Sequence, residues 1–500
     1  MEIGARMARG AMWMVAWRVA DRTLGLVSTI VLVRLLVPAD FGLVAMAMSV
    51  IAVLELLSAF SFDTALIQNQ RAERRHYDTA WTLGVMFGLF NGLVLVALAV
   101  PASRFYAEPR LEAVLYCLAA TSLFGGVANI GTVAFRKELQ LGKEFQFQAA
   151  KKVIMVIVTI VLAILFRSYW ALVIAQIVSS GLGTIISYVM HPYRPSFSLA
   201  GWRDLFNFSK WLLTINFLNF LNSRSVDFII GKVSGARSLG LYSIAHEISN
   251  LPTTELVAPI SRATFPGYAK ISLEPAALRV MFVKVTGVIA LITVPAGVGI
   301  AATSDLIVAL ALGRNWVDAS PLIAVLAFYG VIQSLQSNSG AVLVALGKLR
   351  ALACILAIQA AILLPALVWG AHQAGVMGVA VATLAAGMVL APINLTQVFR
   401  AIDLRYAGFL AAIWRPLVAA AIMYAVVELA QRSWHVETFL EQLQQALALV
   451  TLGAIVYTSA VLALWKLASC PAGAEAYALE KLQVAKILRR RQIKKATLGK

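Results

Sequence analysis

Apolar stretches of about twenty residues, each long enough to cross the hydrocarbon core of a bilayer, recur along the whole chain. Hydrophobic residues make up 60% of the 500 residues and charged residues only 13%, which excludes a soluble globular protein of this length. A backbone exposed to lipid must satisfy its own hydrogen bonds, so each stretch is expected to be a helix. The sequence therefore predicts an all-α polytopic membrane protein with about 14 transmembrane helices. The expected spans cover residues 10–36, 41–67, 79–101, 111–135, 146–166, 170–190, 205–231, 239–262, 279–302, 319–346, 351–371, 375–399, 407–430 and 443–466.

The formal net charge of +18 is explained by topology, because an excess of Lys and Arg is typical of cytoplasmic loops. With the N-terminus placed in the cytoplasm, the inside segments before Lys466 hold 17 Lys and Arg, against eight in the outside loops. This bias predicts that both termini are cytoplasmic, and it argues against nucleic acid as a partner. Twelve spans would give the same parity as fourteen.

A weak internal repeat appears when the chain is shifted by 198 residues. Arg34 then meets Lys232, and "FGLVAMA" (41–47) meets "LGLYSIA" (239–245), with Gly42 on Gly240. Six predicted helices separate the two copies, and this even number indicates parallel repeats rather than inverted ones. The predicted organisation is an N-terminal six-helix lobe (1–200), a C-terminal six-helix lobe (201–404), two additional transmembrane helices (405–468) and a basic cytoplasmic tail (469–500).

The first span carries Arg18, Asp21 and Arg22. Each such group costs about 2.5–3.5 kcal/mol at the centre of a spanning helix, so these side chains are expected to face a protein interior or a watery cavity. In the repeat, Arg18 and Asp21 fall on Asn216 and Asn219. The candidate substrate-binding residues are Arg18, Arg22, Asn216, Asn219 and Arg224. Guanidinium groups suit an anionic ligand because their paired donors match phosphate oxygens.

A structural alternative is that Arg18 pairs with Asp21, and Arg224 with Asp227, only to neutralise buried charge. Carboxylates within the second helix of each lobe could exchange a proton or a sodium ion, or could serve as permanent counter-ions. The candidates for ion coupling are Asp21, Glu55, Glu247 and Glu255. The cations near cytoplasmic helix ends, which are expected to snorkel toward the surface, are Lys151, Lys152, Lys210 and Arg415.

No recognisable catalytic sequence accompanies these charges. The chain has no H-E-x-x-H, no Cys/His metal spacing, no Walker loop and no G-x-S-x-G, each of which would supply a defined chemistry. We therefore expect a protein that is not an enzyme, with no catalytic residue, no metal and no cofactor.

Several segments resemble, in order and spacing, the polysaccharide transport family. These are Wzx-type oligosaccharide flippases of the multidrug/oligosaccharidyl-lipid/polysaccharide exporter superfamily. The most specific parts are the P-x-D-F-G turn from Pro38 to Gly42 and the L-G-x-Y-x-x-A turn from Leu239 to Ala245. The other segments are "FDTALIQ", "FYAEPRLE", "GKVSGARSLGLYSIAHEISNLP", "ISRATFPGYAKI" and "LGRNWVDASPLIAVLAF".

The resemblance implies two six-helix lobes around a central cavity, in the bacterial inner membrane. It also implies flipping of undecaprenyl-diphosphate-linked oligosaccharide from the cytoplasmic to the outer leaflet, for lipopolysaccharide, exopolysaccharide or capsule synthesis. The expected partners are this lipid-linked substrate and membrane lipids, with polysaccharide polymerase or export proteins as further candidates. The alternatives are an ion-coupled multidrug antiporter of the same superfamily and a polytopic glycan ligase or polymerase.

Overall fold

A computed structural model describes residues 2–57, 66–67, 69, 72–138, 140–200, 210–434, 438–471, 473–477 and 479–480. This part of the chain is helical and contains no strand, as predicted. The helices are α1 (Glu2–Leu35), α2 (Pro38–Leu57), α4 (Arg74–Tyr106), α5 (Arg110–Gly126), α6 (Val133–Lys137), α7 (Leu141–Phe166), α8 (Trp170–Met190), α10 (Lys210–Ser249), α11 (Ala258–Lys270), α12 (Pro275–Ala302), α13 (Ser304–Ile307), α14 (Ser320–Ala345), α15 (Leu349–Ile402), α16 (Tyr406–Arg432) and α17 (Phe439–Leu467). Short 3-10 helices cover Ile130–Thr132 and Arg314–Ala319, and π-helical segments cover Pro252–Val257 and Val308–Leu312.

The predicted spans are helical along most of their described length, and the longest exception is residues 127–129 in the span 111–135. By length and composition alone, nine of the described helices could cross a membrane, or ten if one bent pair counts as a span. This number is below fourteen because α15 contains two of the predicted spans. Moreover, α1 and α10 carry several ionisable residues each, which lowers their hydropathy.

The helices are broken within one predicted span and between others. The helix pair built from α5 and Ile130–Lys137 bends by 63°, so the predicted span 111–135 is not one straight helix. Within α10, Gly235 has a φ of 77°, and within α15, Gly375 has a φ of 57°. Glycine adopts this left-handed conformation without the steric cost that a Cβ would add. Both glycines lie at or beside the boundary between two predicted spans, so each marks the turn between them.

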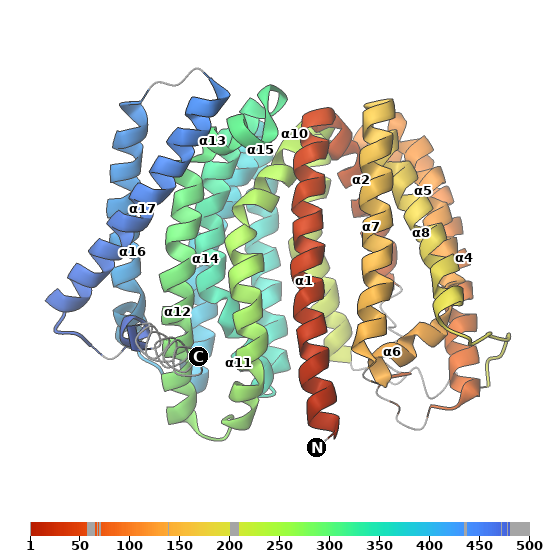
Figure 1. Cartoon of the computed structure of the whole chain (residues 1–500), viewed down its shortest axis with the longest axis horizontal. Helices are drawn as coiled ribbons and strands as arrows, with labels where there is room; N and C mark the ends of the chain where they lie inside the picture. The colour runs from red at the N-terminus through yellow and green to blue at the C-terminus, as the bar shows by residue number, and fades with distance from the viewer. Residues whose placement is uncertain are drawn as a thin grey trace, which may run out of the picture. The chain divides into compact units, whose positions relative to one another are not determined.

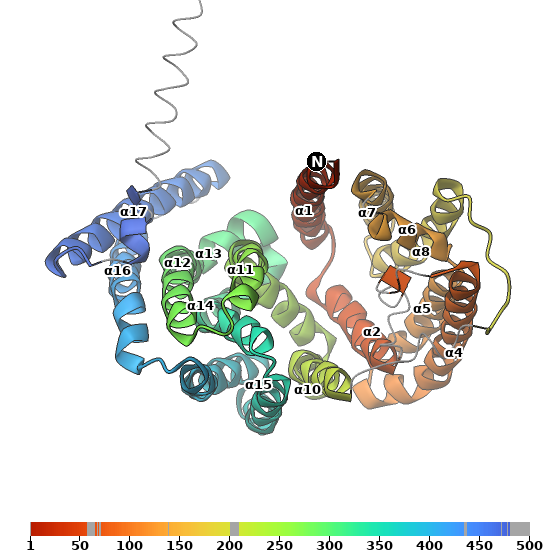
Figure 2. The same cartoon turned by 90° about the horizontal axis from the view of Figure 1, so that it is seen from below.

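The chain divides into two compact units. The first comprises Met1–Ser243, Ala311–Trp316 and Ala371–Val376, and the second comprises Ile244–Leu310, Val317–Gly370 and Met377–Lys500. In the first unit, α1 packs against α7 and α4 packs against α5 (Figure 1). In the second unit, α12 packs against both α14 and α16, and α17 packs against α16 (Figure 2). Lobe boundaries at residues 200 and 404 stay a prediction.

The P-x-D-F-G turn starts α2 through its local chemistry. Pro38 is the first helical residue, where its missing N–H and fixed φ cost nothing. Asp40 reaches back, and its Oδ2 accepts a hydrogen bond from the Val37 backbone N–H at 3.3 Å. This is one half of a capping box. The Phe41 ring lies edge-on against Trp316, with centroids 5.3 Å apart. The turn therefore has a structural role at the start of α2.

Gly42 and Gly240, which the shift of 198 residues superposes, lie against each other in the first unit. A Cβ on Gly42 would lie 1.7 Å from the carbonyl oxygen of Ala236, and a Cβ on Gly240 would lie 1.8 Å from the carbonyl oxygen of Pro38. Pro38 and Ala236 are themselves 198 residues apart. Each copy of the repeat therefore presents the same surface to the other, as in an isologous interface. We call this contact the glycine crossing.

Two further residues of the recognised motifs connect distant segments. The indole Nε1–H of Trp316 donates to the carbonyl oxygen of Val33 at 2.9 Å, and Arg34 Nε donates to the carbonyl oxygen of Ala311 at 3.0 Å. Trp316 is fully buried. The first bond satisfies a carbonyl group in the last turn of α1, where carbonyls lack a partner within the helix. The second bond runs the other way, from a side chain of α1 to a carbonyl group of the π-helical segment Val308–Leu312. The two bonds join "LVRLLVPADFG" to "LGRNWVDA", two of the recognised segments that lie far apart in the sequence.

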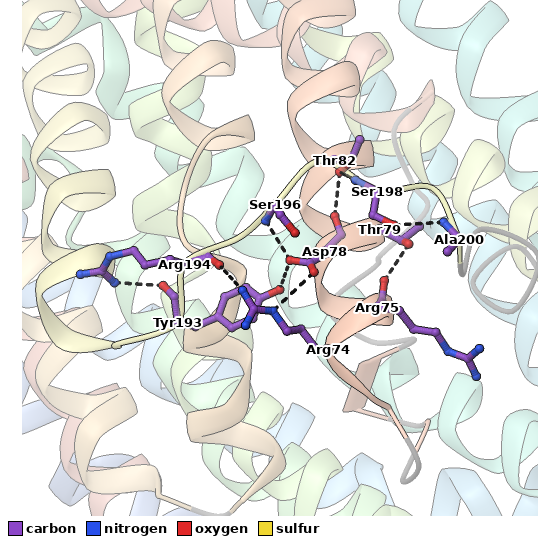
Figure 3. A network of polar contacts seen from close by, with 10 residues as sticks. All are labelled: Arg74, Arg75, Asp78, Thr79, Thr82, Tyr193, Arg194, Ser196, Ser198 and Ala200. Carbon is purple, nitrogen blue, oxygen red and sulfur yellow. Dashed lines mark hydrogen bonds and ion pairs between the residues drawn. The ribbon is translucent and has the colours of Figure 1, made fainter.

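The segment after α8, residues 191–200, lies extended along the N-terminal part of α4, and we call it the connecting strap (Figure 3). The Asp78 carboxylate on α4 accepts hydrogen bonds from the Tyr193 hydroxyl and, at 2.9 Å, from the Ser196 backbone N–H. The side-chain amide of Asn129 donates to the carbonyl oxygen of Tyr193 at 2.8 Å. Because these polar groups are buried or partly buried, their mutual bonds fix the path of the strap.

The chain after α17 returns into the second unit. Glu475 and Arg415 form an ion pair at 2.9 Å, and their side chains are only 2% and 5% exposed. Lys284 lies over the ring of Tyr477 at 4.2 Å. The expectation that Arg415 snorkels is therefore wrong, because a nearby carboxylate provides its counter-charge inside the protein. Most of the predicted basic tail, residues 481–500, lies outside the described residues.

Candidate functional site

Six helices of the first unit, α1, α2, α4, α5, α7 and α8, surround three neighbouring hollows with volumes of about 330, 260 and 410 Å³. All three have Gln176 of α8 in their walls, and the first two also share Lys152 and Met155 of α7. We treat them as one cavity, the N-terminal cavity. A cavity of this size within helices long enough to span a membrane is the natural candidate for a ligand site.

Helical periodicity places the polar groups on this cavity. On α7, Gln148, Lys152 and Met155 follow one another at intervals of four and three residues, which keeps them on one helix face. On α8, Gln176 and Ser180 repeat the interval of four. Amides and cations in a spanning helix raise the free energy of the protein in the membrane unless they face a polar interior. The stripes therefore give the cavity its polar wall.

Lys152 is the central cation of the cavity. Its Nζ lies 3.0 Å from Oδ1 of Asp21 on α1, so the ion pair joins α1 to α7. One helical turn after Asp21, Gly25 leaves space for the ammonium group, which lies 3.7 Å from the position that a Cβ would take. The Lys152 and Asp21 side chains remain 28% and 43% exposed. An ion pair that keeps this much exposure is open to exchange with another anion.

Lys151 is the second cation in the cavity wall. Its Nζ lies 5.2 Å from the centroid of the Phe147 ring, within the range of a cation–π contact. Gly183 on α8 makes room for the aliphatic stem, because a Cβ there would lie 3.2 Å from Cε of Lys151. The expectation that Lys151 and Lys152 snorkel toward the surface is corrected here, because both line the cavity and Lys152 pairs with Asp21.

Of the carboxylates predicted for ion coupling, the structure brings two to the N-terminal cavity. Asp21 lines the first hollow, and Glu55 of α2 lines the third. The other two belong to the second unit. Glu247 is half-buried near the end of α10, and Glu255 is half-buried in the π-helical segment Pro252–Val257.

The predicted substrate-binding arginines of α1 are half-buried. Arg18 and Arg22 each follow a cavity-lining residue, Trp17 and Asp21 respectively. One residue further along a helix points about 100° away. The two arginines therefore flank the lining face of α1 and lie on a neighbouring face of that helix.

The predicted substrate-binding residues Asn216, Asn219 and Arg224 lie on α10. Asn216 is half-buried and Asn219 is exposed. Arg224 forms an ion pair with Asp227 one turn along the same helix, at 3.4 Å. This is the local charge neutralisation that the sequence left open as an alternative.

Sequence reasoning missed the two lysines and Gln176 as cavity residues. Gln176 was detectable, because it is an amide near the middle of the predicted span 170–190, where a polar group needs a partner or a cavity. The lysines were assigned by their distance from a helix end, and that distance gives no information about helix rotation.

The family of the chain follows from a sequence-family comparison. Residues 31–321 match the model of a family described as polysaccharide biosynthesis protein, which covers more than half of the chain. The chain belongs to this family.

Similarity to individual relatives extends further along the chain. It is 25% identical over 383 residues to the lipopolysaccharide biosynthesis protein WzxC of Escherichia coli (strain K12), covering 76% of this chain and 78% of the relative. It is 23% identical over 459 residues to the succinoglycan biosynthesis transport protein ExoT of Rhizobium meliloti (strain 1021), covering 90% of this chain and 92% of the relative.

The fold is that of known membrane transporters. The lipid II flippase MurJ, in an inward closed conformation, matches with a TM-score of 0.72 over 90% of this chain and 99% of MurJ, at 14% identity. A multidrug transporter of the MATE family, in an inward-facing conformation, matches with a TM-score of 0.56 over 77% of this chain and 94% of that protein, at 16% identity. The chain is thus a multi-pass helical membrane protein with the fold shared by these exporters.

Proposed function

We propose that this protein flips a polyprenyl-diphosphate-linked oligosaccharide, of the undecaprenyl type, from the cytoplasmic to the periplasmic leaflet of the bacterial inner membrane by alternating access. The observation that supports this proposal most directly is the N-terminal cavity. Two cations, Lys151 and Lys152, line it between helices long enough to span a membrane, and the chain belongs to a polysaccharide biosynthesis family. The names of WzxC and ExoT, which refer to lipopolysaccharide biosynthesis and to succinoglycan transport, support the same role.

In this proposal the diphosphate enters the cavity and takes the place of Asp21 beside Lys152. Both partners of the existing pair are partly exposed, so the exchange breaks no fully buried contact. A charge-assisted hydrogen bond to a phosphate oxygen then replaces the one to the carboxylate. The released Asp21 becomes available to bind a proton, which would couple the step to ion movement, with Glu55 as a second candidate. Arg18 and Arg22, next to the lining face, are proposed to hold the entering headgroup.

The proposal also covers the orientation of the chain in the membrane and its division into lobes. The excess of Lys and Arg in alternate loops favours cytoplasmic termini. The 198-residue repeat, reinforced by the glycine crossing, favours two six-helix lobes followed by two additional helices. The proposed partners are the lipid-linked substrate and the surrounding lipids.

The test is complementation of a strain that lacks the gene, with surface polysaccharide and lipid-linked intermediates both measured at equal membrane levels of protein. We expect the double variant Lys151→Met and Lys152→Met to lose surface polysaccharide and to accumulate intermediates inside. A matched control is Lys348→Met, because Lys348 is exposed at the start of α15. Normal export by the double variant would overturn the assignment of the cavity.

A second pair of variants tests the arginines separately. Arg18→Ala and Arg22→Ala are expected to slow export, because they remove positive charge beside the cavity entrance used by the headgroup. Normal polysaccharide export at a normal level of protein would exclude both as binding residues and would leave the lysine assignment intact.

A further inference from the structure

The second unit contains a pocket of different chemistry from the N-terminal cavity. It has a volume of about 170 Å³ and lies between α14, the first half of α15 and the second half of α15. Apart from the phenol of Tyr329, the described residues that line it carry no ionisable group; the polar ones are Gln333, Gln336, Ser337, Gln359, Thr383 and Asn394. We call it the amide pocket.

The amide pocket is built by helical spacing. Gln333, Gln336 and Ser337 occupy positions i, i+3 and i+4 of α14 and therefore share one face. On α15, Thr383 and Asn394 lie eleven residues apart, about three full turns, and thus on one face as well. Polar side chains in spanning helices seldom face the lipid; they usually face the protein interior, where they often line a substrate pathway. These two polar faces meet Gln359 from the first half of α15, and this convergence indicates a ligand site.

The side-chain amide of Asn394 in this pocket has only part of its hydrogen-bonding capacity used by the described residues. Asn394 donates from Nδ2 to Oε1 of Gln336 at 2.8 Å. Its Oδ1 is buried and accepts no hydrogen bond from the described part of the chain. A buried acceptor of this kind costs about 1–3 kcal/mol when it stays unpaired. A ligand donor, such as a hydroxyl group, would satisfy it.

The shape of the pocket limits what it can hold. Its volume is below the range of about 300–1,000 Å³ that is usual for drug-sized ligands. The Tyr329 ring packs closely on Gly387, where a Cβ would lie 2.9 Å from Cδ2 of the ring. Because Gly387 has no side chain, the Tyr329 ring has room to form part of the pocket wall. The C–H groups of a sugar ring can pack against such an aromatic face.

We propose that the amide pocket binds one uncharged sugar unit of the transported oligosaccharide. Side-chain amides both donate and accept hydrogen bonds, as sugar hydroxyls do, and so they match a hydroxyl array without formal charge. Among the described lining residues there is no cation and no carboxylate, which disfavours a phosphate, a uronate or a drug cation at this place. The inference rests on the proposed function and adds to it a second, neutral recognition site that contributes to sugar selectivity.

The test measures binding of defined lipids to the purified full-length protein in detergent. The probes are undecaprenyl diphosphate without sugar, and the same lipid carrying one glucose, one galactose or one glucuronic acid. We expect at least one of the two neutral hexoses to tighten binding by roughly tenfold, the sum of one or two hydrogen bonds. Glucuronic acid is expected to give no such gain.

The variant that tests the site combines Gln336→Leu with Asn394→Leu, and Gln444→Leu on the exposed side of α17 is its matched control. The double variant is expected to bind the bare diphosphate as the wild type does, which shows that it is folded, and to lose the gain from the hexose. The control should keep that gain.

Three results would overturn the inference in distinguishable ways. If neither hexose tightens binding to the wild type, or if the gain survives in the double variant, the amide pocket is not a sugar site and the proposed function stands. If the wild type does not bind any of the diphosphate lipids, the proposed function fails and the inference fails with it.

Discussion

The glycine crossing permits a sharp prediction about Gly42→Ala. An ordinary Cβ contact begins at about 3.4 Å, twice the 1.7 Å that separates this Cβ position from the carbonyl oxygen of Ala236. The obstacle is backbone, which cannot rotate away as a side chain can, so α2 and α10 must separate locally. Overpacking of this kind costs about 1–3 kcal/mol. The higher helix propensity of alanine offsets only about 0.5–1 kcal/mol of this loss of stability.

Thermal unfolding of the purified protein in one detergent measures this balance. We expect Gly42→Ala and Gly240→Ala each to lower the Tm by a few degrees, at about 2–4 °C per kcal/mol. Gly340→Ala on α14 is the control, because no described atom beyond its own stretch of helix lies within 4 Å of its Cβ position. It should keep or slightly raise the Tm, since it gains the helix propensity without the clash.

The double variant tests whether the two glycines form one contact. Once a first alanine has separated the backbones, a second alanine at the same crossing meets less resistance, so the two losses should not add. A Tm of Gly42→Ala equal to that of the control would refute the packing argument. Fully additive losses would show that the two glycines act independently.

Three other changes have expected outcomes. Glu475→Gln leaves the buried Arg415 without its counter-ion and should destabilise the second unit by about 3–5 kcal/mol, measured by denaturant unfolding; an unchanged midpoint would contradict the pairing. Trp316→Phe removes an indole hydrogen bond to a backbone carbonyl and should cost about 1–3 kcal/mol, while a Tm equal to wild type would count against that bond. Hydrogen bonds from Arg110 lower the pKa of Glu108, so their contribution is present above the unfolded value of about 4.3 and is lost as the pH falls through the folded value. Glu108→Gln should therefore flatten the dependence of Tm on pH below about 4.3, and a parallel pH profile would be evidence against this linkage.

The fold was predictable because hydrophobicity and loop charge determine which segments cross a bilayer. The expected spans are helical along most of their described length, and the shift that superposes Gly42 on Gly240 identified residues that touch. The 63° bend within the span 111–135 was not predicted, because hydropathy averages over a window and does not register a change of helix direction. The ion pair between Glu475 and Arg415 was not predicted either, because it depends on how the chain after the last span packs against the helices.

The candidate site was only partly predictable. The sequence singled out Asp21 as a charge that needs an interior, and this residue does line the N-terminal cavity. It assigned Lys152 to the surface, because the helix end was close and the rotation of α7 was unknown. The pairing of Arg224 with Asp227 is a local i, i+3 contact, which is why the sequence could offer it as an alternative. Roles for the remaining predicted site residues stay proposals.

The connecting strap has a consequence for biogenesis. Its residues Tyr193 and Ser196 bond to Asp78 and Asn129, so both sides of these contacts come before α10 begins. Domains tend to fold as units during synthesis, N-terminal first. The strap can therefore fasten the first bundle of helices while the remainder of the chain is still on the ribosome. By contrast, the glycine crossing has to wait for Gly240, so a nascent chain truncated at residue 205 should already hold the strap but not the crossing.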